Sequence, residues 1–240
     1  MGERQELADG VRRLIAATVT VGASPEELAE VAAMVKAAAD RLEAVGASGS
    51  APPVARYGAD PRNSEGDSPL AHWMPFDVIV GRCNPVAPPV TVAFEGERAI
   101  GHVVFTTPYE GAPGCVHGAV IAGTFDIMLT AANVLADAAG PTTELTIRYL
   151  RPTLVGVPSR FESWVTAADG RRTSSRGLLI QEGQVTVEAE GVFAPLSRAR
   201  IDALHRRGSS DLSDDPGRPA EPQGSADPDV VHAPIEPKGG

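Results

Sequence analysis

The sequence predicts an α+β protein in which an antiparallel sheet curls around one long central helix. Short segments of alternating apolar residues lie on both sides of a long apolar segment, residues 115–136. That segment carries apolar side chains on every face of a helical wheel, and a helix that is apolar all round is buried all round. Because the elements around it are typical of strands, the sheet has to enclose the helix. The expected order is two strands, one helix and four strands.

The N-terminal part predicts a separate helical extension over residues 1–45. Ser24 precedes Pro25 and two glutamates, a pattern typical of a helix start, and apolar residues recur at helical spacing from Leu28 to Leu42. Residues 46–75 are dense in Gly, Pro, Ser and charged residues. This composition indicates a linker or irregular arm.

The predicted central domain spans residues 76–197. Apolar residues alternate from Phe76 to Val80 and prolines follow, which favours extended chain outside the centre of a sheet. Thr91–Phe94 and Ala99–Phe105 are short β-branched runs separated by a glycine-containing loop. They predict a β-hairpin that precedes the long helix.

The helix is expected to end at Gly140-Pro141, a strong stop signal. Four strands follow, over residues 142–150, 159–167, 173–180 and 185–193. Asp169-Gly170 and Glu182-Gly183 are typical hairpin turns between them. The last segment, residues 206–240, is acidic and rich in proline with few large apolar residues, so we expect it to be disordered.

The composition excludes several classes of function and predicts where the protein is found. The net charge of −10 and the lack of clustered Lys and Arg argue against nucleic acid as a partner. Cys83 and Cys115 show no C-x-x-C spacing, which indicates reduced thiols and a cytoplasmic protein. No segment reaches the ~20 apolar residues of a membrane span, and no metal-ligand spacing is present. An open edge strand on the predicted sheet invites pairing with a second copy, which predicts a dimer.

Asp126 lies inside the apolar segment, where an unpaired buried carboxylate is costly. No Lys or Arg three or four residues away could pair with it. It caps a helix that begins there, or it is exposed to solvent, or it is kept for chemistry. His117-Gly118 has two interpretations as well: a turn that needs glycine, or a helix start whose free N–H groups hold an oxyanion or a thioester carbonyl.

Four segments in this order resemble the hotdog-fold acyl-CoA thioesterases of the PaaI and THEM4-like group. They are NPVAPPV (84–90), PYEGAPGCVHGAVIAGTFD (108–126), TTELTIRYLRPT (142–153) and VEAEGVFAPL (187–196). The resemblance covers roughly half of the chain. It implies the hotdog fold, in which the sheet wraps one central helix.

The resemblance also implies a catalytic set. The backbone N–H of Gly118 would donate to the thioester oxygen, and His117 would orient its loop. Asp126, eight residues on, would act as base or nucleophile from the partner subunit, and Thr142, sixteen residues further, would help to position the attacking water. Ala119 stands where the family pattern usually has a second glycine.

The implied substrate is an acyl-CoA, which places the protein in lipid metabolism, and the implied assembly is a homodimer or a dimer of dimers. No cofactor is expected beyond the coenzyme A of the substrate. Its phosphates need cations, and the candidates, each of which could instead be an ordinary surface charge, are Arg148, Arg151, Arg171 and Arg172. Tyr57, Tyr109 and Trp164 could line the acyl channel or simply pack. The alternative function is a non-catalytic acyl-CoA or fatty-acyl binding hotdog protein, with Ala119 as the mark of lost catalysis.

Overall fold

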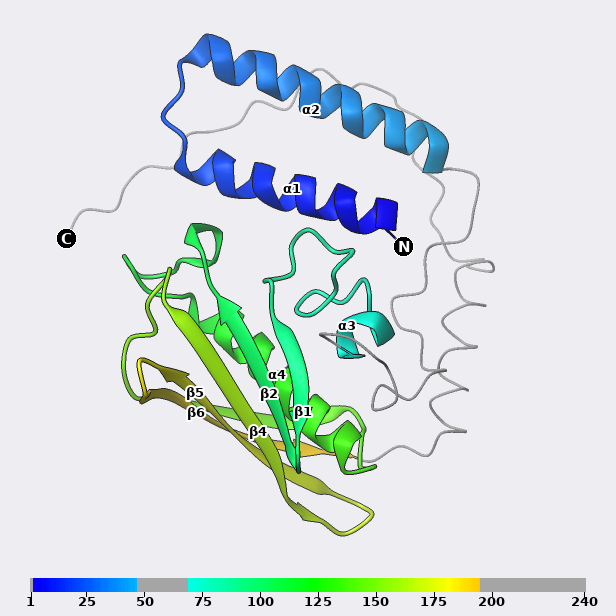
Figure 1. Ribbon diagram of the computed structural model, residues 1–240, viewed down its shortest axis with the longest axis vertical. Coiled ribbons are helices and arrows are strands. Elements are labelled where there is room, and N and C mark those ends of the chain that lie inside the picture. Colours follow the sequence, from blue (N-terminus) through cyan, green and yellow to red (C-terminus); the bar gives the residue numbers. More distant parts are fainter. Residues whose placement is uncertain (1, 47–68, 195–240) are drawn as a thin grey trace, which may run out of the picture. The chain divides into compact units, whose positions relative to one another are not determined.

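The computed structural model describes residues 2–46 and 69–194 (Figure 1). Its centre is a six-stranded antiparallel sheet with the order β1-β2-β4-β5-β6-β3. The strands are β1 (Thr91–Glu95), β2 (Arg98–Val104), β3 (Thr142–Tyr149), β4 (Pro158–Ala168), β5 (Thr173–Gln181) and β6 (Gln184–Phe193). Helix α4 (Gly118–Leu135) packs against β2, β3, β4, β5 and β6. This is the α+β hotdog arrangement that the sequence predicts; the tail from 206 to 240 and residues 47–68 lie outside the described residues.

Strand β3 is one edge of the sheet and pairs only with β6 among the described strands. Its first residue, Thr142, lies opposite Phe193, and its last residue, Tyr149, lies opposite Val187. The turn between β5 and β6 places Glu182 and the following glycine at φ of 50° and 76°, the left-handed conformation of a tight hairpin turn. The sheet therefore ends on a strand whose outer side is open.

Glycines in the strands let α4 approach the sheet closely. A Cβ atom added to Gly177 of β5 would lie 2.9 Å from Cε1 of Phe125. A Cβ atom on Gly101 of β2 would lie 2.8 Å from Sδ of Met128, and Gly191 of β6 is equally crowded. Side chains of the helix thus fill the space that strand side chains would otherwise occupy, and together they form the core.

Helix α4 starts at Gly118, so the alternative in which Asp126 caps a helix beginning there is wrong. The expectation of burial on every face is also wrong. One stripe of α4 is at least partly exposed: Ala119, Ala122, Gly123, Asp126 and Thr130. These residues recur every three or four positions along one side of the helix, so we call them the open stripe of α4.

By length and composition α4 could cross a membrane, and it is the one such helix among the described residues. More than half of it is buried inside the protein, however, as in the core helix of a hotdog fold.

The chain before β1 differs from the prediction for residues 46–75. A short helix, α3 (Pro69–Trp73), lies at the end of the expected irregular arm, and its Leu70 is fully buried in the core. The extended chain expected after it is instead a series of turns, in which Oδ1 of Asp77 accepts the backbone N–H of Val80 at 3.0 Å. The alternating apolar residues here belong to turns and not to a strand. The carboxylate of Asp77 accepts a backbone N–H that would otherwise need a carbonyl oxygen of a neighbouring strand.

The N-terminal residues form two helices, α1 (Gly2–Thr20) and α2 (Pro25–Gly46). Ser24 and Glu27 cap the start of α2 reciprocally: the Glu27 N–H donates to the serine hydroxyl at 3.2 Å, and the Ser24 N–H donates to the Glu27 carboxylate at 2.9 Å. Helix α1 contacts the turns before β1 and the short 3₁₀ helix η2 (Thr107–Tyr109).

We expect Gly177→Ala to lower the free energy of unfolding by about 1–3 kcal/mol, because the methyl group would overlap the ring of Phe125. That ring cannot move freely, since it packs edge-on against Phe161 with 5.0 Å between centroids. Gly101→Ala is the matched control: its methyl meets the flexible end of Met128, so a smaller loss is expected. Urea unfolding followed by circular dichroism measures both, and equal losses would contradict this account of the packing.

Candidate active site

The first turn of α4 presents a free backbone donor. His117 is the N-cap, and its Nδ1 accepts the N–H of Ala119 at 3.0 Å. The His117 N–H itself donates to the carbonyl oxygen of Tyr109 at 2.8 Å. Within the described part of the chain, the N–H of Gly118 has no acceptor, as expected for the first residue of a helix. This donor lies at the positive end of the helix dipole.

Tyr149, at the end of β3, fixes the position of Gly118. Its hydroxyl donates to the carbonyl oxygen of Gly118 at 2.8 Å. A Cβ atom at residue 118 would lie 3.1 Å from the same hydroxyl, so glycine suits this close approach. No signal in the sequence indicates this contact, because it joins a helix start to a strand end 31 residues later.

Asp126 and Thr142 lie together at the other end of β3. The Thr142 hydroxyl donates to Oδ1 of Asp126 at 2.5 Å. Asp126 lies on the open stripe and is only partly buried, and it makes no ion pair within residues 2–46 and 69–194. The hydrogen bond therefore orients a carboxylate in mostly apolar surroundings, with its second oxygen available.

Gly118 and Asp126 are too far apart in one chain to act on one carbonyl group. Eight residues of α-helix separate them, a rise of about 12 Å. The structure thus brings together Asp126 and Thr142, and separately His117 and Gly118. The two pairs lie two turns apart along α4.

Two hollows flank the first turn of α4. The first, about 440 Å³, is lined by Gly118, Tyr149 and Arg151 among others, and we call it the Arg151 hollow. The second, about 720 Å³, lies between α1, the turns of residues 78–89 and the side chains of Ala119 and Val120, and we call it the α1 pocket. Ala119 lines this pocket while the helix start remains regular.

The four arginines predicted to bind the phosphates of coenzyme A do not lie together at one site. Arg151 lines the Arg151 hollow beside Gly118, whereas Arg148 is ion-paired at 3.4 Å with a glutamate of β6. Arg171 and Arg172 lie in the β4–β5 turn, where their backbone N–H groups donate to the carboxylate of Asp169 at 2.9 and 2.7 Å. That turn precedes Thr173, which pairs at the end of the sheet where β3 begins.

The aromatic residues that could line the acyl channel lie in different parts of the structure. Tyr109 lines the α1 pocket, whereas the ring of Trp164 lies under the guanidinium of Arg98, 4.5 Å from ring centroid to Cζ. Tyr57 lies outside the described residues. Across the described ranges, no three His, Cys, Asp or Glu side chains gather as metal ligands.

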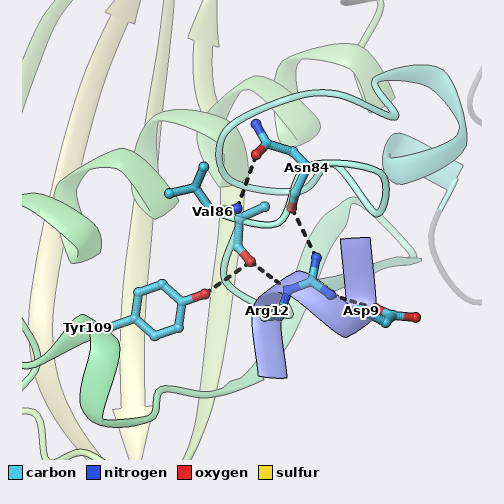
Figure 2. A network of polar contacts seen from close by, with 6 residues as sticks. Asp9, Arg12, Asn84, Val86 and Tyr109 are labelled. Carbon is cyan, nitrogen blue, oxygen red and sulfur yellow. Dashed lines mark hydrogen bonds and ion pairs between the residues drawn. The ribbon is translucent and has the colours of Figure 1, made fainter. Parts of the chain in front are cut away.

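Arg12 of α1 forms a polar network that the sequence analysis did not anticipate (Figure 2). Its guanidinium donates to the carbonyl oxygens of Asn84 at 3.0 Å and Ala87 at 3.3 Å, and it pairs with Asp9 at 2.5 Å. The Tyr109 hydroxyl donates to the same Ala87 oxygen at 3.0 Å. This network, the Arg12 clamp, attaches α1 to the rest of the described structure.

No protein-family model matches the chain, and no curated protein does. Among solved structures, a crystallised thioesterase superfamily protein is 33% identical, with a TM-score of 0.66. The match covers 80% of this chain and 94% of that one. The chain therefore belongs to the thioesterase superfamily.

Two further solved structures are more distant. Thioesterase superfamily member 2 from Mus musculus is 16% identical over 44% of this chain and 80% of its own, with a TM-score of 0.42. The PaaI protein of E. coli is 14% identical over 45% of this chain and 80% of its own, with a TM-score of 0.43.

Desolvation raises the pKa of both Tyr109 and Tyr149 above the ordinary value of 10.0, although Arg12 opposes part of the effect on Tyr109. A pKa that is higher in the folded state adds stability below the unfolded pKa, and this stability is lost as the pH rises through the folded pKa. We therefore expect the free energy of unfolding to fall above about pH 10. Urea titrations across that range should show a shallower fall in the double variant Tyr109→Phe/Tyr149→Phe, and an unchanged slope would contradict the assignment.

Proposed function

We propose that this protein hydrolyses the thioester of an acyl-CoA to a free acid and coenzyme A. The observation that carries the proposal is the hydrogen bond from Thr142 to Asp126 on the open stripe of α4. A carboxylate oriented by a hydroxyl group in an apolar helix is costly for the fold and useful for chemistry. Membership of the thioesterase superfamily supports this class of reaction.

The proposed oxyanion donor is the backbone N–H of Gly118. A thioester carbonyl oxygen gains negative charge when it is attacked, and a fixed donor at a helix N-terminus stabilises that charge. His117 supports this role because its ring occupies the next N–H, that of Ala119, and leaves the Gly118 N–H unoccupied. Tyr149 holds the residue from the other side.

The proposed active unit is a homodimer, alone or within a dimer of dimers. The rise of about 12 Å between Gly118 and Asp126 means that the two groups must come from different copies. Two copies that pair antiparallel along the open side of β3 would bring the Thr142 end of one strand beside the Tyr149 end of the other. Asp126 of the partner subunit would then face Gly118.

In the proposed reaction, Asp126 takes a proton from a water molecule, and the water oxygen attacks the carbonyl carbon. The carbonyl electron pair moves to the oxygen at the Gly118 N–H. When the tetrahedral intermediate collapses, the C–S bond breaks and the proton passes to the sulfur of coenzyme A. Thr142 has donated its one hydrogen to Asp126, and its oxygen lone pairs remain to accept from the same water.

Arg151 is the predicted cation that best fits coenzyme A. It lines the hollow that also contains Gly118, although it donates to the carbonyl oxygen of Val185 at 3.1 Å as well. A guanidinium there favours the phosphates of the substrate on this side of the carbonyl group.

We expect Asp126→Asn to lower the rate of acyl-CoA hydrolysis by about 10²–10⁴-fold, because the amide keeps the shape but cannot take the proton. Thr142→Val should reduce the rate less, and Thr143→Val is its matched control, since among the described residues the Thr143 hydroxyl donates to the Val192 carbonyl oxygen and not to Asp126. Thiol release from a panel of acyl-CoAs measures all three. Equal rates for wild type and Asp126→Asn would contradict the proposal, and tight acyl-CoA binding without turnover would favour the non-catalytic binding protein.

The contribution of the partner is tested by mixing two inactive variants. Gly118→Pro removes the N–H and fits the backbone, because proline is favoured at the first helical position and His117 already has the extended ψ of 130°. Losing one oxyanion donor should cost about 10²–10³-fold. After Gly118→Pro is unfolded and refolded together with Asp126→Asn, mixed dimers should regain activity at one of two sites.

Gly118→Ala is the control for that experiment, because it keeps the N–H and adds a Cβ near Tyr149. Its rate should stay well above that of Gly118→Pro. Failure of the mixed dimers to recover activity, with both parents soluble and dimeric, would mean that the site is not shared between subunits.

A further inference from the structure

We propose that the α1 pocket receives the acyl group, and that α1 thereby selects acyl-CoAs with a large apolar acyl chain. This inference rests on the proposed function, since the pocket begins beside the carbonyl-binding Gly118. The thioester carbon carries two substituents, the sulfur of coenzyme A and the acyl chain. Two hollows flank the first turn of α4, so each substituent has one hollow to enter.

The surfaces of the two hollows next to the first turn of α4 differ, and this difference indicates which substituent enters which hollow. The Arg151 hollow contains a guanidinium beside Gly118, which suits the phosphate-bearing side of the substrate. The α1 pocket also contains charged residues on α1, namely Asp9, Arg12 and Arg13, but Arg12 is engaged by Asp9 and by two backbone carbonyl oxygens. On α4, its lining residues are Ala119 and Val120, which carry no polar side-chain atoms. The apolar acyl chain is therefore expected in the α1 pocket.

The lining of the α1 pocket is apolar on opposite walls. Ile15 and Ala16 come from α1, and Val78, Ile79 and Val86 come from the turns before β1. Val78 and Val86 are 58% and 59% exposed, unusual for valines that line a concave surface. An acyl chain between these walls would remove that apolar surface from water.

The size of the pocket excludes a good fit for a short acyl group. A water molecule occupies about 30 Å³ of liquid, so an acetyl group, about twice that, would leave most of the 720 Å³ empty. The volume instead lies in the range of pockets that enclose drug-sized ligands, about 300–1,000 Å³. A chain of medium length or longer, or an aromatic acyl group, matches it.

The Arg12 clamp makes α1 a fixed wall of this pocket. Arg12 and Tyr109 both donate to the carbonyl oxygen of Ala87, which is 1% exposed. Because the clamp lies beside the apolar lining, the position of Ile15 and Ala16 over the pocket is set by charge-assisted hydrogen bonds. A larger side chain at Ala16 should therefore shorten the pocket instead of displacing the helix.

The test compares Ala16→Trp with Ala17→Trp, since Ala16 lines the pocket and its exposed neighbour Ala17 does not. We expect Ala16→Trp to lower kcat/KM for decanoyl-CoA by at least about tenfold while butanoyl-CoA changes by less than about twofold. Ala17→Trp should change neither. Equal losses for the two substrates, or the same selectivity in both variants, would overturn the inference and leave the proposed function standing.

A variant on the opposite wall of the pocket and a measurement of decanoate binding extend the test. Val86→Trp, which fills the pocket from the opposite side, should show the same loss of selectivity if Ala16→Trp does not fold. Decanoic acid binding, measured by calorimetry, reports on the pocket without turnover. If no thioester is hydrolysed but Ala16→Trp alone loses decanoate binding, the pocket is correct and the proposed function is wrong. If wild type neither hydrolyses decanoyl-CoA nor binds decanoate, the pocket inference is wrong.

Discussion

The structure depends on the close packing of α4 onto the glycine-bearing strands. Gly177 admits the ring of Phe125, and on the neighbouring strand β4 the buried Ser163 hydroxyl donates to the carbonyl oxygen of Met128 at 2.8 Å. These contacts fix both the distance of the helix from the sheet and its rotation about its own axis. Once the face with Phe125 and Met128 is held by the sheet, Asp126 lies on the open stripe, within reach of the first residue of β3. The site therefore follows from the packing of the core.

Because the rotation of α4 is fixed, strand β3 can contact it at two defined positions. It runs along α4 in the opposite direction, so its first residue, Thr142, meets Asp126 and its last, Tyr149, meets Gly118. One edge strand thus positions the carboxylate and holds the helix start with the free N–H. Because that strand is also the open edge of the sheet, assembly with a second copy would bring the two halves of the site together without rearranging either.

The fold was predictable because apolar periodicity and turn residues agree along the chain from β1 to β6. Three features were not predictable. The turns around Asp77 look like a strand, since alternation of apolar residues does not reveal a side-chain acceptor. The open stripe of α4 contains Ala, Gly and Thr, which a helical wheel cannot assign to core or surface. The contacts of Tyr149 and Arg12 join residues distant in sequence, where spacing carries no information. The resemblance suggested Gly118, Asp126 and Thr142, and their catalytic roles stay predictions.

Ala119 is the residue that departs from the family motif, and its place in the structure bears on what this departure means. Its backbone N–H is the one that His117 caps, and the proposed oxyanion donor is the preceding N–H, that of Gly118. Ala119 lines the α1 pocket, one residue after that donor. Replacing glycine by alanine there changes the wall that an acyl chain would touch and leaves the donor and the helix start in place. Under the proposed function, the departure therefore bears on which substrate fits.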